Sequence, residues 1–112
     1  MHLTPVGLEH YLIVSAALFC LGVLGVIMRR NLIVMYMSLE LMLNAANLSF
    51  LAASRMHSLD TPGGRIDLQG PIFAIFVIVV AAVEAAVGLA LVIALYRRKQ
   101  TVSLDDVVDL KD

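Results

Sequence analysis

The sequence lacks tryptophan and is poor in residues suited to redox or metal chemistry. Cys20 is its single cysteine, which excludes an intrachain disulfide and an iron–sulfur cluster held by this chain. The three histidines, His2, His10 and His57, lie near the ends of apolar runs or in expected loops, and form no cluster with metal-ligand spacing. No glycine-rich phosphate loop follows a strand-like segment, so hydrolysis and nucleotide binding have no support. We expect Cys20, inside an apolar run, to be a small buried packing residue.

Charge is scarce as well. Charged residues make up 15% of the 112 residues and the formal net charge is −1, so nothing favours binding to nucleic acid. Hydrophobic residues make up 61%, whereas a soluble domain has about 45–50%. One soluble core of this length could not bury so much apolar surface. We therefore predict an integral membrane protein whose immediate surroundings are the lipid bilayer.

Long apolar runs predict an all-α fold with three transmembrane helices in a small bundle. Each run has roughly the 20 residues that a helix needs to cross about 30 Å of hydrocarbon, and none alternates as the strands of a barrel would. Residues 1–99 are predicted to form one membrane domain, followed by an acidic tail over 100–112. The expected helices cover about 11–28, 32–53 and 72–96.

Basic residues near the ends of the runs predict the orientation. Arg29 and Arg30 flank the first two runs, and residues 97–99 lie on the same side because the second and third runs form a hairpin. The expected loop over 54–70 has no basic excess, and no Lys or Arg precedes the first run. The N-terminus is therefore expected outside and the C-terminus in the cytoplasm. No basic region or clear cleavage site precedes the first run, so we expect no removable signal peptide.

The acidic tail, "QTVSLDDVVDLKD", contains one weak structural signal. Ser103 followed by Asp106 is typical of the start of a short helix. The simpler expectation is a solvated, partly disordered end. The alternative is that the tail docks against a cytoplasmic partner.

Two carboxylates interrupt the apolar runs, Glu40 in the second and Glu84 near the middle of the third. A charged side chain at this depth costs about 2.5–3.5 kcal/mol or more. Each carboxylate must therefore be protonated, paired, or in contact with water inside a bundle. A purely structural hydrogen bond across a helix interface is the alternative, but two such residues on adjacent helices favour proton or charge transfer.

Polar residues around Glu40 share one side of the second helix. Tyr36, Glu40, Asn44 and Asn47 recur at spacings of three and four residues, which places them in one polar stripe facing another helix or a hydrated cavity. The asparagines alone are more typical of hydrogen bonds between helices than of a relay. Small residues surround Glu84 and recur along the first run at Ser15, Gly22 and Gly25, which predicts close helix packing.

The stretches "RRNLIVMYMSLELMLNAANLSF" and "AAVEAAVGLALVIALYRR" resemble the K-subunit family of bacterial respiratory complex I, the proton-translocating NADH:quinone oxidoreductase. The mitochondrial counterpart is a small three-helix membrane subunit. The resemblance covers about residues 11–99 and implies a location in the bacterial plasma (inner) membrane.

The resemblance also implies roles for individual residues. Glu40 and Glu84 match the two family glutamates in the polar axis of the membrane arm, and Arg29 and Arg30 match its paired loop arginines. It implies that this chain is not functional as a monomer and contacts the A, H, J and N subunits. FMN, iron–sulfur clusters and quinone are implied in other subunits, so this chain would be a non-redox subunit of the translocase.

Other families fit parts of the pattern. The small subunit of multisubunit cation/proton antiporters shares a similar three-helix pattern. A purely structural assembly subunit is a further alternative, and its carboxylates would be replaceable. Small multidrug exporters carry an intramembrane glutamate too, but they need four spans and aromatic-rich contacts. The 54–70 loop is longer than is usual in the K-subunit family, which affects local contacts there and not the glutamates.

Overall fold

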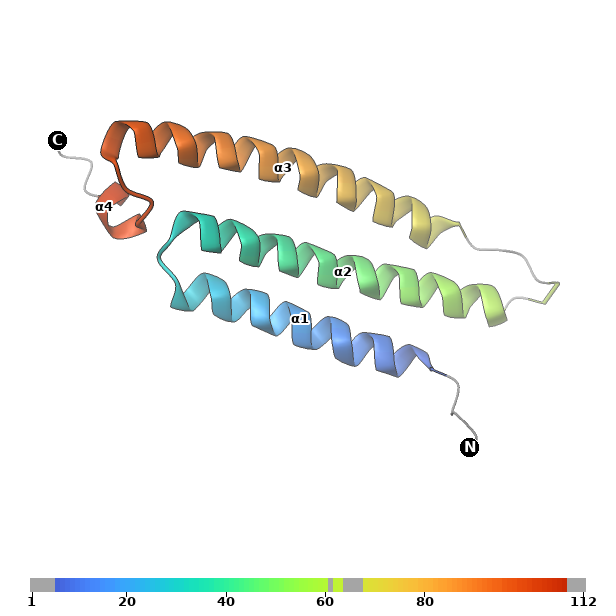
Figure 1. The fold of residues 1–112 in the computed structure, drawn as a ribbon. Helices are drawn as coiled ribbons and strands as arrows, with labels where there is room; N and C mark the ends of the chain where they lie inside the picture. The colour runs from blue at the N-terminus through green and yellow to red at the C-terminus, as the bar shows by residue number, and fades with distance from the viewer. Residues whose placement is uncertain (1–5, 61, 64–67, 109–112) are drawn as a thin grey trace.

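Three long helices lie in a row in the computed structural model, which describes residues 6–60, 62–63 and 68–108 (Figure 1). The central helix, α2, packs against α1 on one side and α3 on the other. The helices are α1 Leu8–Met28, α2 Leu32–Asp60, α3 Gln69–Lys99 and the short α4 Leu104–Val108. The predicted all-α class with three long apolar helices is confirmed, and the protein is a multi-pass membrane protein.

The helix ends differ from those expected at the α2–α3 connection. Residues 54–60 continue α2 and residues 69–71 already belong to α3, so the connection is shorter than the predicted loop. Polar side chains do not stop a helix, because its backbone hydrogen bonds are internal. Pro71 is tolerated since it lies in the first turn of α3, where a backbone N–H has no helical partner.

The seam between α1 and α2 is built from small residues. Ser15 and Gly22 are buried there. A Cβ atom on Gly22 would collide with the Met42 side chain and lie 2.8 Å from the backbone oxygen of Ser38. The two backbones therefore approach closely, as the predicted small-residue seam implied. Close approach matters in a membrane because helices associate there through van der Waals packing and not through the hydrophobic effect.

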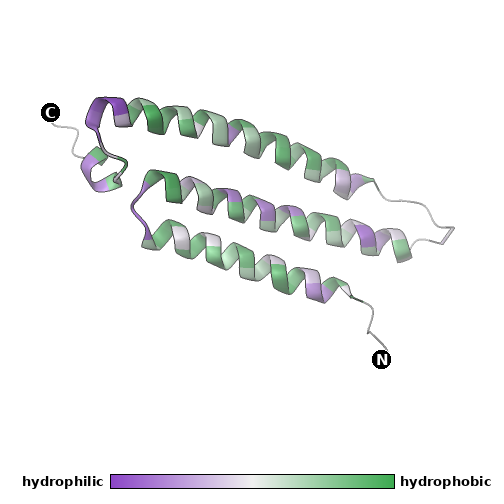
Figure 2. Cartoon of the chain, in the orientation of Figure 1, coloured by the Kyte–Doolittle hydropathy of each residue, from purple (hydrophilic) through white to green (hydrophobic). Residues whose placement is uncertain are grey.

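A second seam joins α2 to α3. The buried residues of α3 are Gly70, Ala74, Ala81, Gly88 and Val92. The rings of Phe50 and Phe73 stack across the seam with centroids 6.3 Å apart. Large apolar residues are instead exposed on all three long helices, and Figure 2 shows that most of each helix is hydrophobic. That distribution suits a protein whose outer faces meet lipid or other apolar helices.

Cys20 departs from the sequence-based expectation. It is exposed on α1 and not buried. Cys20 comes two residues before Gly22, about 200° around the helix, so it faces away from the α1–α2 seam. The apolar residues around Cys20 in the sequence predicted a membrane-spanning helix. They did not predict which side of that helix packs against α2.

The tail after α3 turns back across the end of the layer. Gln100 adopts a left-handed conformation (φ 56°) and ends α3. Ser103 then pairs with Asn31 in an antiparallel bridge, and α4 follows at Leu104. The weak capping signal at Ser103 is confirmed as the start of a short helix. The described part of the tail is docked on its own chain.

Candidate functional site

Two close contacts fix how α2 and α3 are aligned. A Cβ atom on Gly88 would collide with the ring of Tyr36, and one on Gly70 would collide with the side chain of Ser54. The helices run antiparallel, so each step forward along α2 matches an equal step backward along α3. Glu40 lies four residues after Tyr36 and Glu84 lies four residues before Gly88. The two carboxylates are therefore level with each other across the α2–α3 seam.

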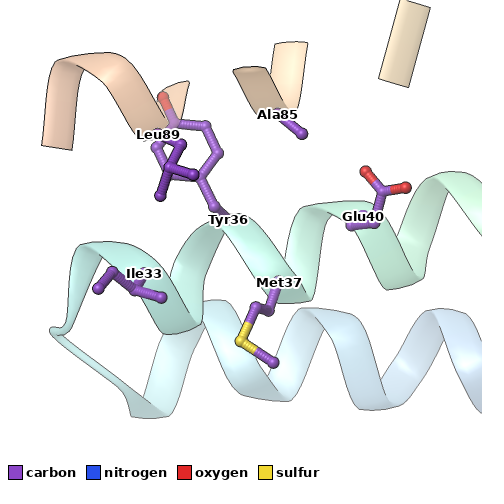
Figure 3. Close-up of a pocket in the computed structure, with 6 residues that line it drawn as sticks. All are labelled: Ile33, Tyr36, Met37, Glu40, Ala85 and Leu89. Atoms are coloured by element: carbon purple, nitrogen blue, oxygen red, sulfur yellow. The ribbon is translucent and has the colours of Figure 1, made fainter. Parts of the chain in front are cut away.

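Glu40 lines a hollow on one face of the layer (Figure 3). The hollow has a volume of about 210 Å³, and its walls are almost entirely apolar. Glu40 is half-buried there. The other lining residues come from α2 and α3: Ile33, Tyr36, Met37, Ala85 and Leu89.

Glu84 lines a different hollow, also of about 210 Å³. Phe19 of α1 also lines it. Glu84 itself is exposed in the isolated chain. The α2 residues of this hollow are Leu39, Met42, Leu43 and Ala46.

The two hollows open on opposite faces of the layer. They have no lining residue in common. Met37 lines the first and Leu39 the second, and two residues along a helix correspond to a rotation of about 200°. Glu40 and Glu84 therefore share one level and one seam but present their side chains to different surroundings.

Neither carboxylate is bound by the residues that the structure describes. Among the described residues, the structure records no hydrogen bond or ion pair to Glu40 or Glu84. Such a group in an apolar region needs a proton, a hydrogen-bond donor, a cation or water. Because the described part of this chain supplies no partner, a partner for each carboxylate has to come from outside it.

The predicted polar stripe on α2 is divided by the packing. Tyr36 lies against Gly88, and Asn47 is 7% exposed, so both belong to the α2–α3 seam. The side-chain oxygen of Asn47 has no hydrogen-bond partner among the described residues. Asn44 is exposed on α2 and lies outside this seam. The stripe is wider than the contact with α3, so a residue at its edge lies outside the contact.

The paired arginines also have different surroundings. Both side chains are exposed, and Arg30 forms an ion pair with Asp105 of the tail. The structure records no such partner for Arg29 in the part of the chain that it describes. Sequence reasoning missed the role of Asp105; the only signal was opposite charge in the loop and the tail.

A hydroxyl cluster in the α1–α2 seam was only partly foreseen. Ser15 donates a hydrogen bond to the backbone oxygen of Ala45 at 2.5 Å, and its Oγ lies 2.6 Å from that of Ser49. Ser15 was expected in a packing seam, but Ser49 carried no signal beyond being polar. The cluster is internally satisfied, which is typical of a structural hydrogen bond between helices.

No metal centre is evident in the region that the structure covers. Among residues 6–60, 62–63 and 68–108, no three His, Cys, Asp or Glu side chains come close enough together to hold a metal ion. The site consists of the two carboxylates, their apolar hollows and the seam between them.

The sequence profile of NADH-ubiquinone/plastoquinone oxidoreductase chain 4L matches residues 10–112. The chain belongs to this family. The match covers all three long helices, including both carboxylates and the arginine pair. The expected resemblance to the complex I K-subunit family is therefore confirmed.

Individual relatives are similar over almost the whole chain. NADH-quinone oxidoreductase subunit K of Desulfitobacterium hafniense is 56% identical over 90% of this chain and 91% of its own length. Subunit K 1 of Geobacter sulfurreducens is 53% identical over 95% of this chain and 98% of its own. Subunit K 1 of Koribacter versatilis is 49% identical over 97% of this chain and 99% of its own length. Each of these three relatives thus aligns with at least 90% of this chain.

Proposed function

We propose that this chain is a membrane-arm subunit of a proton-translocating NADH:quinone oxidoreductase. The family match over residues 10–112 and the relatives named subunit K support this assignment over that of a cation/proton antiporter subunit. The chain would cross the bacterial plasma membrane three times, with its N-terminus outside and its C-terminus in the cytoplasm, as the basic flanks indicate. Neighbouring subunits of the A, H, J and N types would cover its apolar outer faces.

Glu40 and Glu84 would couple quinone reduction to proton translocation. The observation that carries this proposal is their arrangement: level across one seam, open to opposite faces, and unbound within the described chain. Each carboxylate would exchange a proton or sense a charge on its own face. A neighbour on one face would thereby communicate with a neighbour on the other through this subunit.

Electrostatics gives the coupling a sign. Packed helix axes lie about 8–10 Å apart, and two like charges at that separation repel by about 2 kcal/mol at an effective dielectric constant of 20. A change of charge at one carboxylate therefore changes the electrostatic potential at the other, in the direction of like-charge repulsion. Moving one charge against 100 mV needs about 2.3 kcal/mol, so this repulsion supplies part of one step, and the redox reaction in other subunits supplies the rest.

The chemistry of electron transfer would lie elsewhere. FMN, iron–sulfur clusters and quinone would bind to other subunits, and this chain would act as a non-redox subunit of the translocase. Its own residues hold or move protons at the Glu40 and Glu84 carboxylates. Tyr36 closes the seam beside Glu40, and Asn44 offers a hydrogen-bonding amide on the outer surface one turn further along.

The test replaces each carboxylate by its uncharged counterpart in the complete complex. Glu40→Gln and Glu84→Gln are expected to lower proton uptake per NADH oxidised by about tenfold or more, because a positioned proton-transfer group contributes typically about 10²–10⁴-fold. Glu9→Gln is the matched control, because Glu9 lies exposed in the first turn of α1 and away from the seam. Proton uptake and NADH oxidation are measured in the same membrane vesicles.

The outcomes distinguish a proton-relay role of Glu40 and Glu84 from a structural role. Unchanged proton uptake in both glutamine variants, with the complex fully assembled, would rule out the relay. Loss of assembly in both would instead assign Glu40 and Glu84 a structural role. Loss of proton uptake in Glu9→Gln as well would show that the effect does not depend on the seam.

A further inference from the structure

The tail supplies part of the N-terminal cap of α2. The first backbone N–H groups of a helix have no partner inside it. In α2, the Asn31 side chain accepts hydrogen bonds from the N–H groups of Ile33 (2.9 Å) and Val34 (3.4 Å). The N–H of Leu32 instead donates to the backbone oxygen of Val102 in the tail, at 3.0 Å. The cap of the helix that carries Glu40 is therefore completed by a segment about 70 residues away in the chain.

The contact is a two-stranded bridge and not a single hydrogen bond. The N–H of Leu104 donates to the backbone oxygen of Arg30 at 2.6 Å, opposite the bond from Leu32 to Val102. These two bonds flank the antiparallel pair Asn31 and Ser103. Residues paired in this way exchange no hydrogen bond themselves, and their Cα atoms are the closer kind of pair, about 4.5 Å apart.

Charge adds to the backbone pairing. Asp105 forms its ion pair with Arg30, the residue whose carbonyl accepts the bond from Leu104. Asp106, the next residue, instead accepts a hydrogen bond from Thr101 at 3.0 Å, within the tail. The two neighbouring aspartates thus have distinct partners. An ion pair as exposed as this one contributes little alone, so the backbone bonds carry most of the docking.

We propose that residues 101–105 form a strap that stays docked on the α1–α2 loop in the working complex. The strap begins at the end of α3 and completes the start of α2, so it ties together the two helices that carry Glu84 and Glu40. It also assigns the adjacent arginines different roles: Arg30 is engaged within the chain, and Arg29 is left open toward neighbours. The docking rests on contacts within the chain, whereas its persistence during turnover rests on the proposed function.

Cross-linking tests the docking directly. The double variant Asn31→Cys with Ser103→Cys, in a Cys20→Ala background, places two thiols on the closely spaced pair, where disulfide geometry is met at Cα separations of about 4.4–6.8 Å. After mild oxidation of membranes, a maleimide-polymer gel shift reports the remaining thiols. We expect more than about half of the subunit to be cross-linked, and less than about a tenth in the control Asn31→Cys with Val108→Cys.

Activity of the oxidised complex tests whether the strap stays in place. We expect NADH:quinone activity within about twofold of the reduced sample, because a docked strap does not move during turnover. Equal cross-linking in the Ser103 and Val108 pairs would overturn the docking. A loss of activity on oxidation that a reductant reverses would overturn a static strap.

A charge exchange keeps the inference testable if the cysteine variants do not assemble. Arg30→Asp places two like charges together and is expected to lower the amount of assembled complex. Adding Asp105→Arg restores the opposite charges and is expected to recover assembly by about threefold, whereas adding Asp106→Arg is not. Equal recovery by both arginine substitutions would show that net charge matters and would overturn the specific pairing of Arg30 with Asp105.

Discussion

The two seams of α2 use polar residues in opposite ways. Toward α1, the hydroxyls of Ser15 and Ser49 meet each other and the backbone oxygen of Ala45, so the polar atoms are bound within the chain. Toward α3, the Asn47 oxygen and the Glu40 and Glu84 carboxylates find no partner in the described residues. One seam is closed and internally satisfied; the other leaves polar groups to be satisfied from outside.

This difference distinguishes two contacts of the same helix by whether their polar groups are hydrogen-bonded among the described residues. Polar groups in a membrane are costly unless bound. The α2–α3 seam carries three polar groups without a described partner, and the α1–α2 hydroxyl cluster carries none. Leaving such groups unbound is costly, which indicates that neighbours, protons or water complete the α2–α3 seam. The α1–α2 seam then serves to hold α2 in place, and its failure should affect assembly before it affects coupling.

The strongest way to break the comparison is to force the closed seam apart. Gly22→Leu would drive its side chain into Met42 and the backbone of Ser38, which cannot move aside. Overpacking of this kind costs about 1–3 kcal/mol and sometimes more, so we expect assembled complex to fall about tenfold. Native gels of solubilised membranes measure this amount. Ala17→Leu, exposed on the same helix, is the control; an equal loss there would show that the seam is not responsible.

The open seam can be tested at its closest contact. Gly88→Ala would push the Tyr36 ring out of place beside Glu40, and we expect activity of the assembled complex to fall about three- to tenfold. Tyr36→Leu in the same background should restore much of it. NADH:quinone activity in membranes is the measurement.

A separate change at Tyr36 isolates its hydroxyl. Tyr36→Phe alone should change activity by less than about twofold, since the structure records no hydrogen bond to that hydroxyl among the described residues. A larger loss would show that the hydroxyl, and not the ring, is what the seam requires. The same activity assay in membranes decides between the two.

The two asparagines sharpen the comparison within one stripe. Asn47→Leu removes a buried oxygen without a partner, which is close to neutral for stability, so we expect assembly and proton uptake within about twofold. Asn44→Leu removes an exposed amide beside Glu40 and should lower proton uptake per NADH by about two- to fivefold. Proton uptake per NADH oxidised, measured in membrane vesicles, compares the two variants. The reverse ranking would place the functional amide inside the seam.

The smallest expected effect is at the closed hydroxyl cluster. Ser15→Ala removes an interhelical hydrogen bond, and such bonds average about 0.6 kcal/mol in membranes, so the midpoint of thermal dissociation in detergent should fall by only a few degrees. Ser15→Ala with Ser49→Ala should cost little more than Ser15→Ala alone, because both hydroxyls belong to one network. Fully additive losses would argue against a shared network.

Apolar runs were enough to predict the three helices, because a chain that crosses lipid must satisfy its backbone internally. The same logic placed Glu40 and Glu84 at depth and predicted the glycine seam at Gly22. It did not place the helix ends around residues 54–70, where polar residues continue α2 and α3 outside the apolar runs. It also missed the exposure of Cys20. Helical spacing predicts which residues share one side of a helix, but not whether that side packs against another helix.

The sequence by itself determined the membrane class, the three helices and the depth of the two carboxylates, since length and hydrophobicity act locally along the chain. Only the tertiary structure decided that Glu40 and Glu84 are level yet open to opposite faces, that Asn44 leaves the seam while Asn47 stays in it, and that Asp105 binds Arg30. These features depend on the register and rotation of one helix against another. Register and rotation are set by close contacts such as that of Tyr36 with Gly88, between residues far apart in the chain.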